Sequence, residues 1–110
     1  MPMTVMVTRN APARYRGFLA SCLLEVAPGV YTASRMSRAV RERVWNVCLE
    51  WSAALPPDGG VVMLWDAPSE PGGQNILVLG DPPKEIVEHE GNLLAKRPLL
   101  PHEATGGPDP

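Results

Sequence analysis

The sequence predicts an α+β sandwich, in which two helices cover one face of a single sheet. Three observations support this fold class. Apolar β-favouring stretches and amphipathic helical stretches follow one another in the order β-α-β-α-β-β. The links between them are short and are marked by proline and glycine. The chain has 110 residues, 45% of them hydrophobic, which suits one small domain with a single modest core. Such elements bury their apolar sides by layering helices on a sheet.

The first part of the chain predicts a strand, a helix and a second strand. The stretch from Met3 to Thr8 is short and valine-rich, which is typical of a buried strand. Pro12 suits the first position of a helix over 13–26, and the proline-glycine pair at 28–29 ends that helix. The brief run GVYT at 29–32 predicts the second strand. The predicted apolar face of this helix consists of Phe18, Leu19, Cys22, Leu23 and Val26.

A second helix and two longer apolar strands follow. Ser37 can cap the helix at its N-terminus, and the sequence LPPDGG at 55–60 ends it. The runs VVMLW at 61–65 and NILVLG at 75–80 are almost continuously apolar, which predicts central strands buried on at least one face. A short apolar piece at 92–95 predicts a last strand, which a dimer could exchange. The predicted apolar side of the second helix consists of Val40, Val44, Val47, Cys48 and Trp51.

We expect one domain and a tail. Residues 1–97 are predicted to form the domain, and residues 98–110, rich in proline and glycine, a flexible tail. Cys22 and Cys48 lie in predicted helices and lack the spacing of a zinc site or redox pair, so both are expected to be buried and reduced. No stretch approaches the roughly 18 apolar residues of a membrane span, and no leader pattern is present. A cytoplasmic protein is therefore expected, without a membrane partner.

Charge is distributed unevenly along the chain. Residues 1–43 contain seven arginines and two glutamates, a net charge of +5, whereas the remainder contains three basic and ten acidic residues, a net charge of −7. The planar fork of N–H donors on arginine suits phosphate. The asymmetry therefore favours a surface that binds a polyanion, and a solvated charged surface is the alternative.

Two of these arginines, Arg14 and Arg16, fall in the first turns of the first predicted helix. Cations are unfavourable there because the helix N-terminus carries partial positive charge, so stability alone does not explain them. Unpaired backbone N–H groups at the same place form an anion site. Since residues two apart on a helix point in different directions, the pair would straddle a phosphate backbone. The alternative is that both arginines lie over apolar surface near Tyr15.

Catalytic motifs are weak in this sequence. No residue spacing matches a nucleophilic triad or a zinc site. Asp66 and Glu70 follow a predicted strand and are the candidates for catalysis and for holding magnesium in a dimer, but a polar loop carries such residues without any ligand. Trp45, Trp51 and Trp65 fall on predicted helix or strand positions, which favours packing in a core or interface over stacking on bases.

Three sequence blocks resemble one known family. They are N-x-P-x-R-x-R-G at 10–17, LLEV-x-x-GVY at 23–31 and VVM-x-W at 61–65, with a helix containing VRERVW between the last two. In this order and spacing they closely resemble the type I-E branch of the Cas2 family of CRISPR-associated proteins. The resemblance runs from Met1 to about Gly80, and more weakly to about Leu100.

The resemblance implies a ferredoxin-like fold, a symmetric homodimer and a role in CRISPR spacer acquisition. In the family, the dimer is a scaffold that binds duplex protospacer DNA and bridges two dimers of the Cas1 integrase, which performs the transesterification. The DNA-binding residues that the resemblance implies here are Asn10, Arg14, Arg16, Arg38 and Arg41. Among these, Arg38 aligns less cleanly, because the chain has one extra residue nearby.

The C-terminal strand is where the resemblance implies docking of the integrase, with Leu93, Leu94 and Lys96. The first strand, by contrast, departs from the family. Many members carry an acidic residue at its end, assigned as the metal ligand of a nuclease, whereas this chain has Arg9. Because a cation repels magnesium, this departure argues for binding rather than hydrolysis.

Three functional classes follow from these observations. The leading hypothesis is a DNA-binding scaffold of spacer acquisition that requires no cofactor. Its partners are duplex DNA, Cas1 and a second copy of the chain. The alternative is a magnesium-dependent endonuclease acting on single-stranded RNA or duplex DNA, in which Asp66 or Glu70 replaces the missing acid. A third class is a protein-interaction module whose arginines form surface ion pairs.

Overall fold

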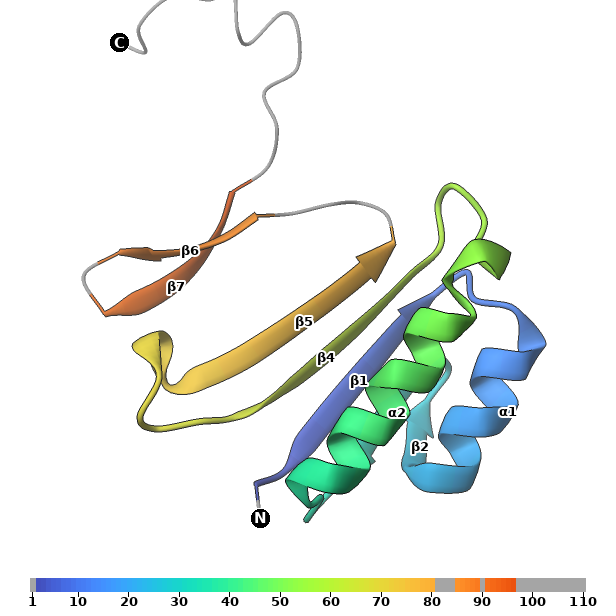
Figure 1. The fold of residues 1–110 in the computed structure, drawn as a ribbon, viewed down its shortest axis with the longest axis horizontal. Coiled ribbons are helices and arrows are strands. Elements are labelled where there is room, and N and C mark those ends of the chain that lie inside the picture. Colours follow the sequence, from blue (N-terminus) through green and yellow to red (C-terminus); the bar gives the residue numbers. More distant parts are fainter. Residues whose placement is uncertain (1, 81–84, 90, 97–110) are drawn as a thin grey trace, which may run out of the picture.

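The computed structural model describes residues 2–80, 85–89 and 91–96 (Figure 1). Five strands form one antiparallel sheet, two further strands form a hairpin, and two α-helices pack on the large sheet. The strands are β1 (Thr4–Arg9), β2 (Leu24–Ala27), β3 (Val30–Ala33), β4 (Gly60–Asp66), β5 (Gln74–Gly80), β6 (Glu85–His89) and β7 (Asn92–Lys96). The helices are α1 (Ala13–Cys22) and α2 (Arg38–Glu50), with short 3-10 turns η1 (Ser52–Ala54) and η2 (Pro71–Gly73).

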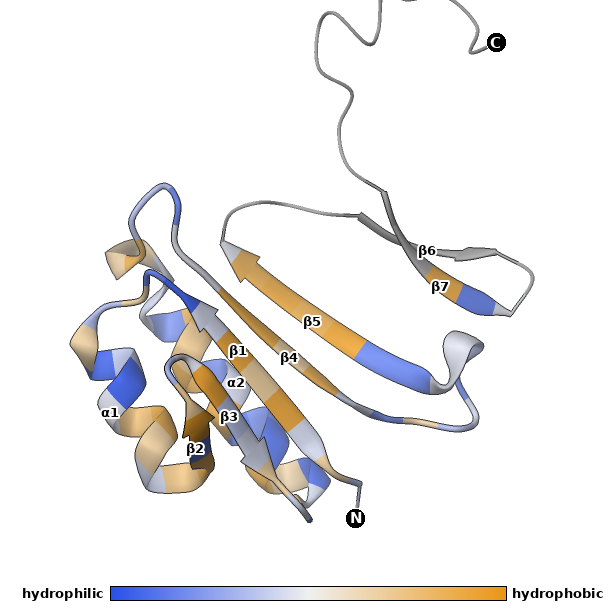
Figure 2. Ribbon diagram, turned by 180° about the vertical axis from the view of Figure 1, so that it is seen from behind, coloured by the Kyte–Doolittle hydropathy of each residue, from blue (hydrophilic) through white to orange (hydrophobic). Residues whose placement is uncertain are grey.

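The order of the strands gives a ferredoxin-like arrangement. The large sheet runs β2-β3-β1-β4-β5, and each neighbouring pair is antiparallel. Helix α1 connects β1 to β2 across β3, and α2 connects β3 to β4 across β1. Both helices cover the same face of the sheet (Figures 1 and 2). The predicted α+β fold, with two helices on one face, is confirmed.

The core lies between the sheet and the two helices. Met6 of β1 and Leu19 of α1 are fully buried, and Val44 of α2 is almost so. Tyr15 joins the helices, because its hydroxyl donates a hydrogen bond of 2.8 Å to the Cys48 carbonyl. The other buried apolar residues are Leu23, Tyr31, Met36, Val61 and Met63. Packing against the sheet stabilises two helices that are short for independent stability.

The first helix is shorter than the sequence predicts. It ends at Cys22 instead of Val26, and 24–27 form β2, a strand that the apolar periodicity had assigned to the helix. The reason is a tertiary contact: β2 pairs with β3 in a hairpin, and this pairing outweighs local helical preference. At the turn, Gly29 has a φ of 78° and its carbonyl accepts a 2.7 Å hydrogen bond from the Thr8 amide. A side chain on Gly29 would collide with the Thr8 carbonyl, so this turn requires glycine.

The second helix and the two long strands lie where the sequence predicts them. Ser37 is the N-cap of α2, and its hydroxyl accepts a hydrogen bond of 3.2 Å from the Val40 amide. Val44 and Cys48 on its predicted apolar side are buried. Val40, however, is 42% exposed, because it lies in the first turn, ahead of the first buried position. The strands predicted at 61–65 and 75–80 are β4 and β5. Only β4 is central as predicted: β5 lies at the edge of the five-stranded sheet, and none of its residues is fully buried.

The face of the sheet opposite the helices is apolar and has no covering layer among the described residues (Figure 2). Side chains alternate along β1, so Met6 faces the helices and Val7, which is 37% exposed, faces away. Cross-strand partners share a face, so Val7 lies between Val30 and Val62, and Val62 lies beside Val78. We name as the open sheet face the residues Val5, Val7, Val30, Val62, Leu64, Ile76 and Val78.

The C-terminal part of the described chain is a hairpin of β6 and β7. The last strand, predicted at 92–95, is confirmed as β7, whereas β6 was not predicted. Within one chain β7 pairs with β6, and its exchange in a dimer stays a prediction. The predicted boundary at 97 and the predicted tail at 98–110 lie outside the described residues. In the part of the chain that the structure describes, every helix is too short or too polar to span a membrane.

The two cysteines differ in exposure, which corrects the prediction that both are buried. Cys48 is fully buried in α2, whereas Cys22 is exposed. Cys22 is the last residue of the shortened α1, and the chain leaves the helix directly after it, so Leu23 is buried in the core while Cys22 stays at the surface.

We expect the two thiols to react at very different rates. Burial, with a smaller contribution from Cys22, raises the pKa of the Cys48 thiol to about 11, so at neutral pH this thiol stays protonated and unreactive. In native protein, one thiol per chain should react rapidly with dithionitrobenzoate, and the second only after unfolding by denaturant. The Cys22→Ser variant should lose the rapid phase. A rapid phase that persists in Cys22→Ser would contradict the burial of Cys48.

Candidate nucleic-acid interface

The N-terminus of α1 carries exposed arginines and no acidic residue in its first turn. Pro12 precedes the helix and provides no side-chain cap, and the first turn contains no acidic residue. Arg14 and Arg16 are both exposed. Neither forms an ion pair with a carboxylate of the described residues. The predicted position of the two arginines is confirmed, and their charges add to the partial positive charge of the helix end.

Arg14 lies over the ring of Trp51, at the C-terminal end of α2. Its guanidinium carbon is 4.3 Å from the ring centroid, which is a cation–π contact. Trp51 is held in turn by edge-to-face contacts with Tyr15 and Phe18, whose ring centroids are each 5.5 Å from its own. The alternative expectation of an arginine over apolar surface is therefore correct for Arg14. The residue nevertheless remains exposed to solvent.

Arg16 lines a polar hollow of about 400 Å³ at the end of β1, away from Trp51. The positive charge of Arg16 acts on the neighbouring Tyr31. Burial and then the Glu25 carboxylate raise the pKa of the Tyr31 hydroxyl, and Arg16 opposes this shift. Arg14 and Arg16 thus have different surroundings, as expected for residues two apart on a helix. The other residues that line this hollow are Thr8, Asn10, Ala11, Glu25, Pro28 and Gly29.

Asn10 forms the turn between β1 and α1. Its φ is 49°, in the left-handed region that asparagine tolerates better than most residues. Its side-chain amide donates a hydrogen bond of 2.6 Å to Oδ1 of Asp58, in the loop before β4. Asn10 therefore lies in the hollow of Arg16 and ties two loops together, and its contact with DNA stays a prediction.

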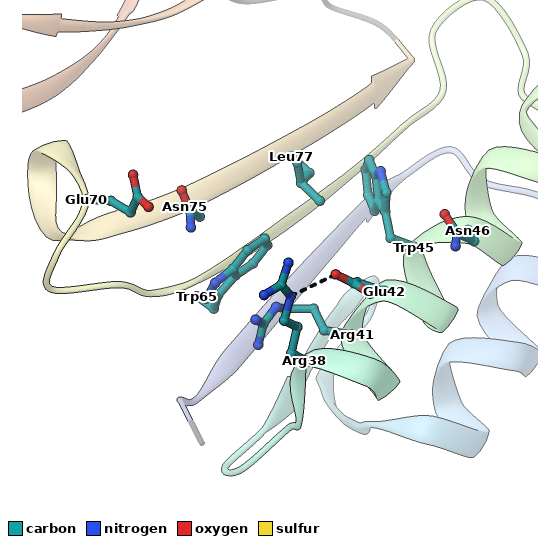
Figure 3. Close-up of a pocket in the computed structure, with 9 residues that line it drawn as sticks. All are labelled: Arg38, Arg41, Glu42, Trp45, Asn46, Trp65, Glu70, Asn75 and Leu77. Carbon is teal, nitrogen blue, oxygen red and sulfur yellow. Dashed lines mark hydrogen bonds and ion pairs between the residues drawn. The ribbon is translucent and has the colours of Figure 1, made fainter.

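The other predicted DNA-binding arginines lie on α2, at a groove of about 520 Å³ between this helix and strands β4 and β5 (Figure 3). Arg41 lies over the ring of Trp65, 4.2 Å from its centroid, and its Nη1 donates a long hydrogen bond of 3.5 Å to the Met36 carbonyl. Arg38 instead donates from Nε to Glu42 at 3.0 Å, in an exposed ion pair. The groove is lined by Arg38, Arg41, Glu42, Trp45, Asn46, Trp65, Glu70, Asn75 and Leu77.

The acidic candidates do not share a site within one chain. Asp66 ends β4 and lines a hollow beside η2, whereas Glu70 lines the groove of α2. The described residues contain no group of three or more histidine, cysteine or acidic side chains that could hold a metal ion. Arg9 ends β1 and is exposed. A magnesium site formed by Asp66 or Glu70 across a dimer stays a prediction.

One of the three predicted partner-docking residues has a described side chain. Leu93 of β7 is half-buried and packs against Gly72 of η2, so a Cβ on Gly72 would overlap it. Leu94 and Lys96 lie in the same strand, and their side chains are outside the described part. The docking role of all three stays a prediction.

The tryptophans contribute to this surface in a way that the sequence does not predict. Trp45, Trp51 and Trp65 pack against the core, as predicted. Trp51 and Trp65 also carry Arg14 and Arg41 on their rings. Sequence spacing gives no signal for these contacts, because each arginine and its tryptophan come from different elements. We refer to the pairs Arg14–Trp51 and Arg41–Trp65 as the two arginine–tryptophan stacks.

A comparison with protein-family models gives a match over most of the chain. The model described as CRISPR-associated protein (Cas_Cas2CT1978) matches residues 3–94. The matched segment includes both helices, the whole five-stranded sheet and every arginine of the surface described above.

Proposed function

The chain belongs to this CRISPR-associated Cas2 family, and from this premise we propose that it is the DNA-binding scaffold of spacer acquisition. Membership implies a role in CRISPR adaptation. In the proposed role a homodimer binds duplex protospacer DNA and bridges dimers of the Cas1 integrase. The integrase performs the transesterification, and this chain requires no metal or cofactor for its own part.

The observation that carries the proposal is the pair of unpaired arginines at the N-terminus of α1. Arg14 and Arg16 have no carboxylate partner among the described residues, although this position disfavours cations. A phosphate would satisfy both the helix N–H groups and the two side chains. The different directions of Arg14 and Arg16 suit successive phosphates rather than one.

The open sheet face supports the homodimer. A row of four valines crosses β3, β1, β4 and β5 on the face that no other described part of the chain covers. Contiguous apolar surface of this kind marks protein–protein contacts, and two such sheets can pack face to face around a twofold axis. In that arrangement the helices of both protomers lie on the outside, so Arg14 and Arg16 of both copies stay free for DNA. Two copies double the net charge of +5 carried by 1–43.

Phosphate recognition by these arginines predicts how the protein binds. Contacts to the DNA backbone carry no base information, so binding is nearly independent of sequence. Each phosphate neutralised by an arginine releases counterions, so affinity falls with salt with a slope of about −0.9 per contact.

Spacer integration in vitro tests the proposal. The reaction combines this protein, its cognate Cas1, a short DNA duplex and a supercoiled plasmid with a CRISPR array. We expect integration to require the protein and to proceed with duplexes of unrelated sequence, with heat-denatured protein as the control. Equal integration without the protein would overturn the scaffold role. Cleavage of RNA or duplex DNA by the protein alone in magnesium would favour the endonuclease instead.

A further inference from the structure

We infer that Trp51 and Trp65 are positioning residues for DNA binding, each holding one arginine that has no carboxylate partner among the described residues and so keeps N–H donors for phosphate. The inference rests on the proposed function and adds two aromatic residues to it. The observations that support it are the two arginine–tryptophan stacks and the contrast with Arg38, whose guanidinium is paired with the Glu42 carboxylate.

The stack at α1 has a rigid support. Trp51 contacts Tyr15 and Phe18 edge to face, at interplanar angles of 86° and 75°. Tyr15 is fully buried and its hydroxyl bonds to the Cys48 carbonyl, three residues before Trp51. The packing of α1 on α2 therefore fixes the orientation of the indole ring over which Arg14 lies.

The stack at the α2 groove is built from other elements. Trp65 belongs to β4, opposite Thr4 of β1 and Asn75 of β5, so three strands support its position. Arg41 approaches its ring from α2, and the Met36 carbonyl accepts from Arg41 Nη1. Figure 3 shows the two side chains meeting in the same groove, Trp65 coming from the sheet and Arg41 from helix α2.

A guanidinium that stacks on an aromatic ring keeps its N–H donors available for other partners. The five N–H donors of arginine lie in the plane of the group and point outward from its edges, whereas a stacked ring covers a face. Arg14 and Arg41 thus keep donors for phosphate oxygens, although Nη1 of Arg41 also makes a long hydrogen bond to the Met36 carbonyl. Arg38 differs, because its Nε is paired with the carboxylate of Glu42, which competes with phosphate. A stacked side chain also has less rotamer freedom to lose when DNA binds, which favours binding.

Equilibrium binding to a fluorescein-labelled duplex of arbitrary sequence tests this inference. Trp51→Leu and Trp65→Leu should each weaken binding about ten-fold, since ordering one long side chain costs roughly two-fold to ten-fold and a dimer carries each stack twice. The salt slope should stay unchanged, because no charge is removed. Trp51→Phe and Trp65→Phe keep a ring beneath the arginine and should retain most of the affinity. Melting temperatures of all variants are measured in parallel.

Double-mutant cycles separate positioning from a structural role. In an Arg14→Ala background, Trp51→Leu should have no further effect, whereas in an Arg41→Ala background it should have its full effect. Trp65→Leu should show the reverse pattern, and it provides an independent test if Trp51→Leu unfolds the protein. Equal loss in both backgrounds would overturn the inference, as would unchanged affinity in both leucine variants. Failure of the scaffold proposal looks different: wild-type protein would not bind the duplex, or Arg14→Ala/Arg16→Ala would bind like wild type.

Discussion

Simultaneous replacement of Arg14 and Arg16 by alanine should weaken binding to duplex DNA by about 100-fold to 1,000-fold at physiological salt. A dimer loses four arginines, and each phosphate contact contributes roughly 1 kcal/mol through counterion release. The slope of log affinity against log salt should become shallower by about 3.6. The fold should remain intact, because both residues are exposed and cations at a helix N-terminus are unfavourable. Fluorescence anisotropy over a salt series measures both quantities.

The matched control for this variant is Arg35→Ala/Arg43→Ala. It removes the same charge from two exposed arginines that neither stack on a tryptophan nor line the hollows described above. We expect the control to lose far less affinity, since its arginines contribute only to the general field of the protein. Equal losses of affinity in the two double variants would mean that DNA is attracted by net charge alone. The proposal that DNA binds at the N-terminus of α1 would then be wrong.

The sequence predicted the fold class, because several of the strands and the start of each helix have strong local patterns. The valine-rich β1, the Ser37 cap and the runs of β4 and β5 are each visible without tertiary information. The C-terminal end of α1 was not predictable in this way, since Leu23 and Val26 fit a helical face as well as they fit a hairpin. The sequence is also compatible with a hairpin around Pro28-Gly29 in place of the last helical turn, because apolar residues flank this turn on both sides.

The sequence predicted which charged residues form the candidate site, but not the contacts that those residues make. The position of Arg14 and Arg16 follows from the start of one helix, and this start is set locally by Pro12. The surroundings of each arginine depend instead on which elements pack together. Trp51 reaches Arg14 because Tyr15 fixes α1 against α2, and no periodicity within either helix encodes that contact. The ion pair of Arg38 with Glu42 is the exception, since residues four apart on a helix are neighbours by geometry.

A single substitution on the open sheet face, Val7→Glu, should convert the proposed dimer into a monomer. Val7 lies on β1, between Val30 of β3 and Val62 of β4, and its own exposure of 37% lets a monomer accommodate the carboxylate in solvent. In a sheet-to-sheet dimer, both copies would bury that charge among valines, at a cost of several kcal/mol per ion. The dissociation constant of the dimer should therefore rise by at least about 1,000-fold. Size-exclusion chromatography with light scattering measures the oligomeric state across a range of concentrations.

The control for Val7→Glu is Leu49→Glu, which makes the same kind of change at a comparably exposed apolar residue on α2 (44% exposed), on the helix side of the sheet. Leu49→Glu should remain dimeric. Val7→Glu should also bind duplex DNA more weakly than wild type, although no arginine has been changed, because a monomer presents only half of the phosphate contacts. If Val7→Glu stays dimeric while Leu49→Glu dissociates, the helices form the interface and Arg14 cannot be free in both copies. If Val7→Glu is monomeric and binds DNA as tightly as wild type, one chain makes all the phosphate contacts, and dimerisation is not required for DNA binding.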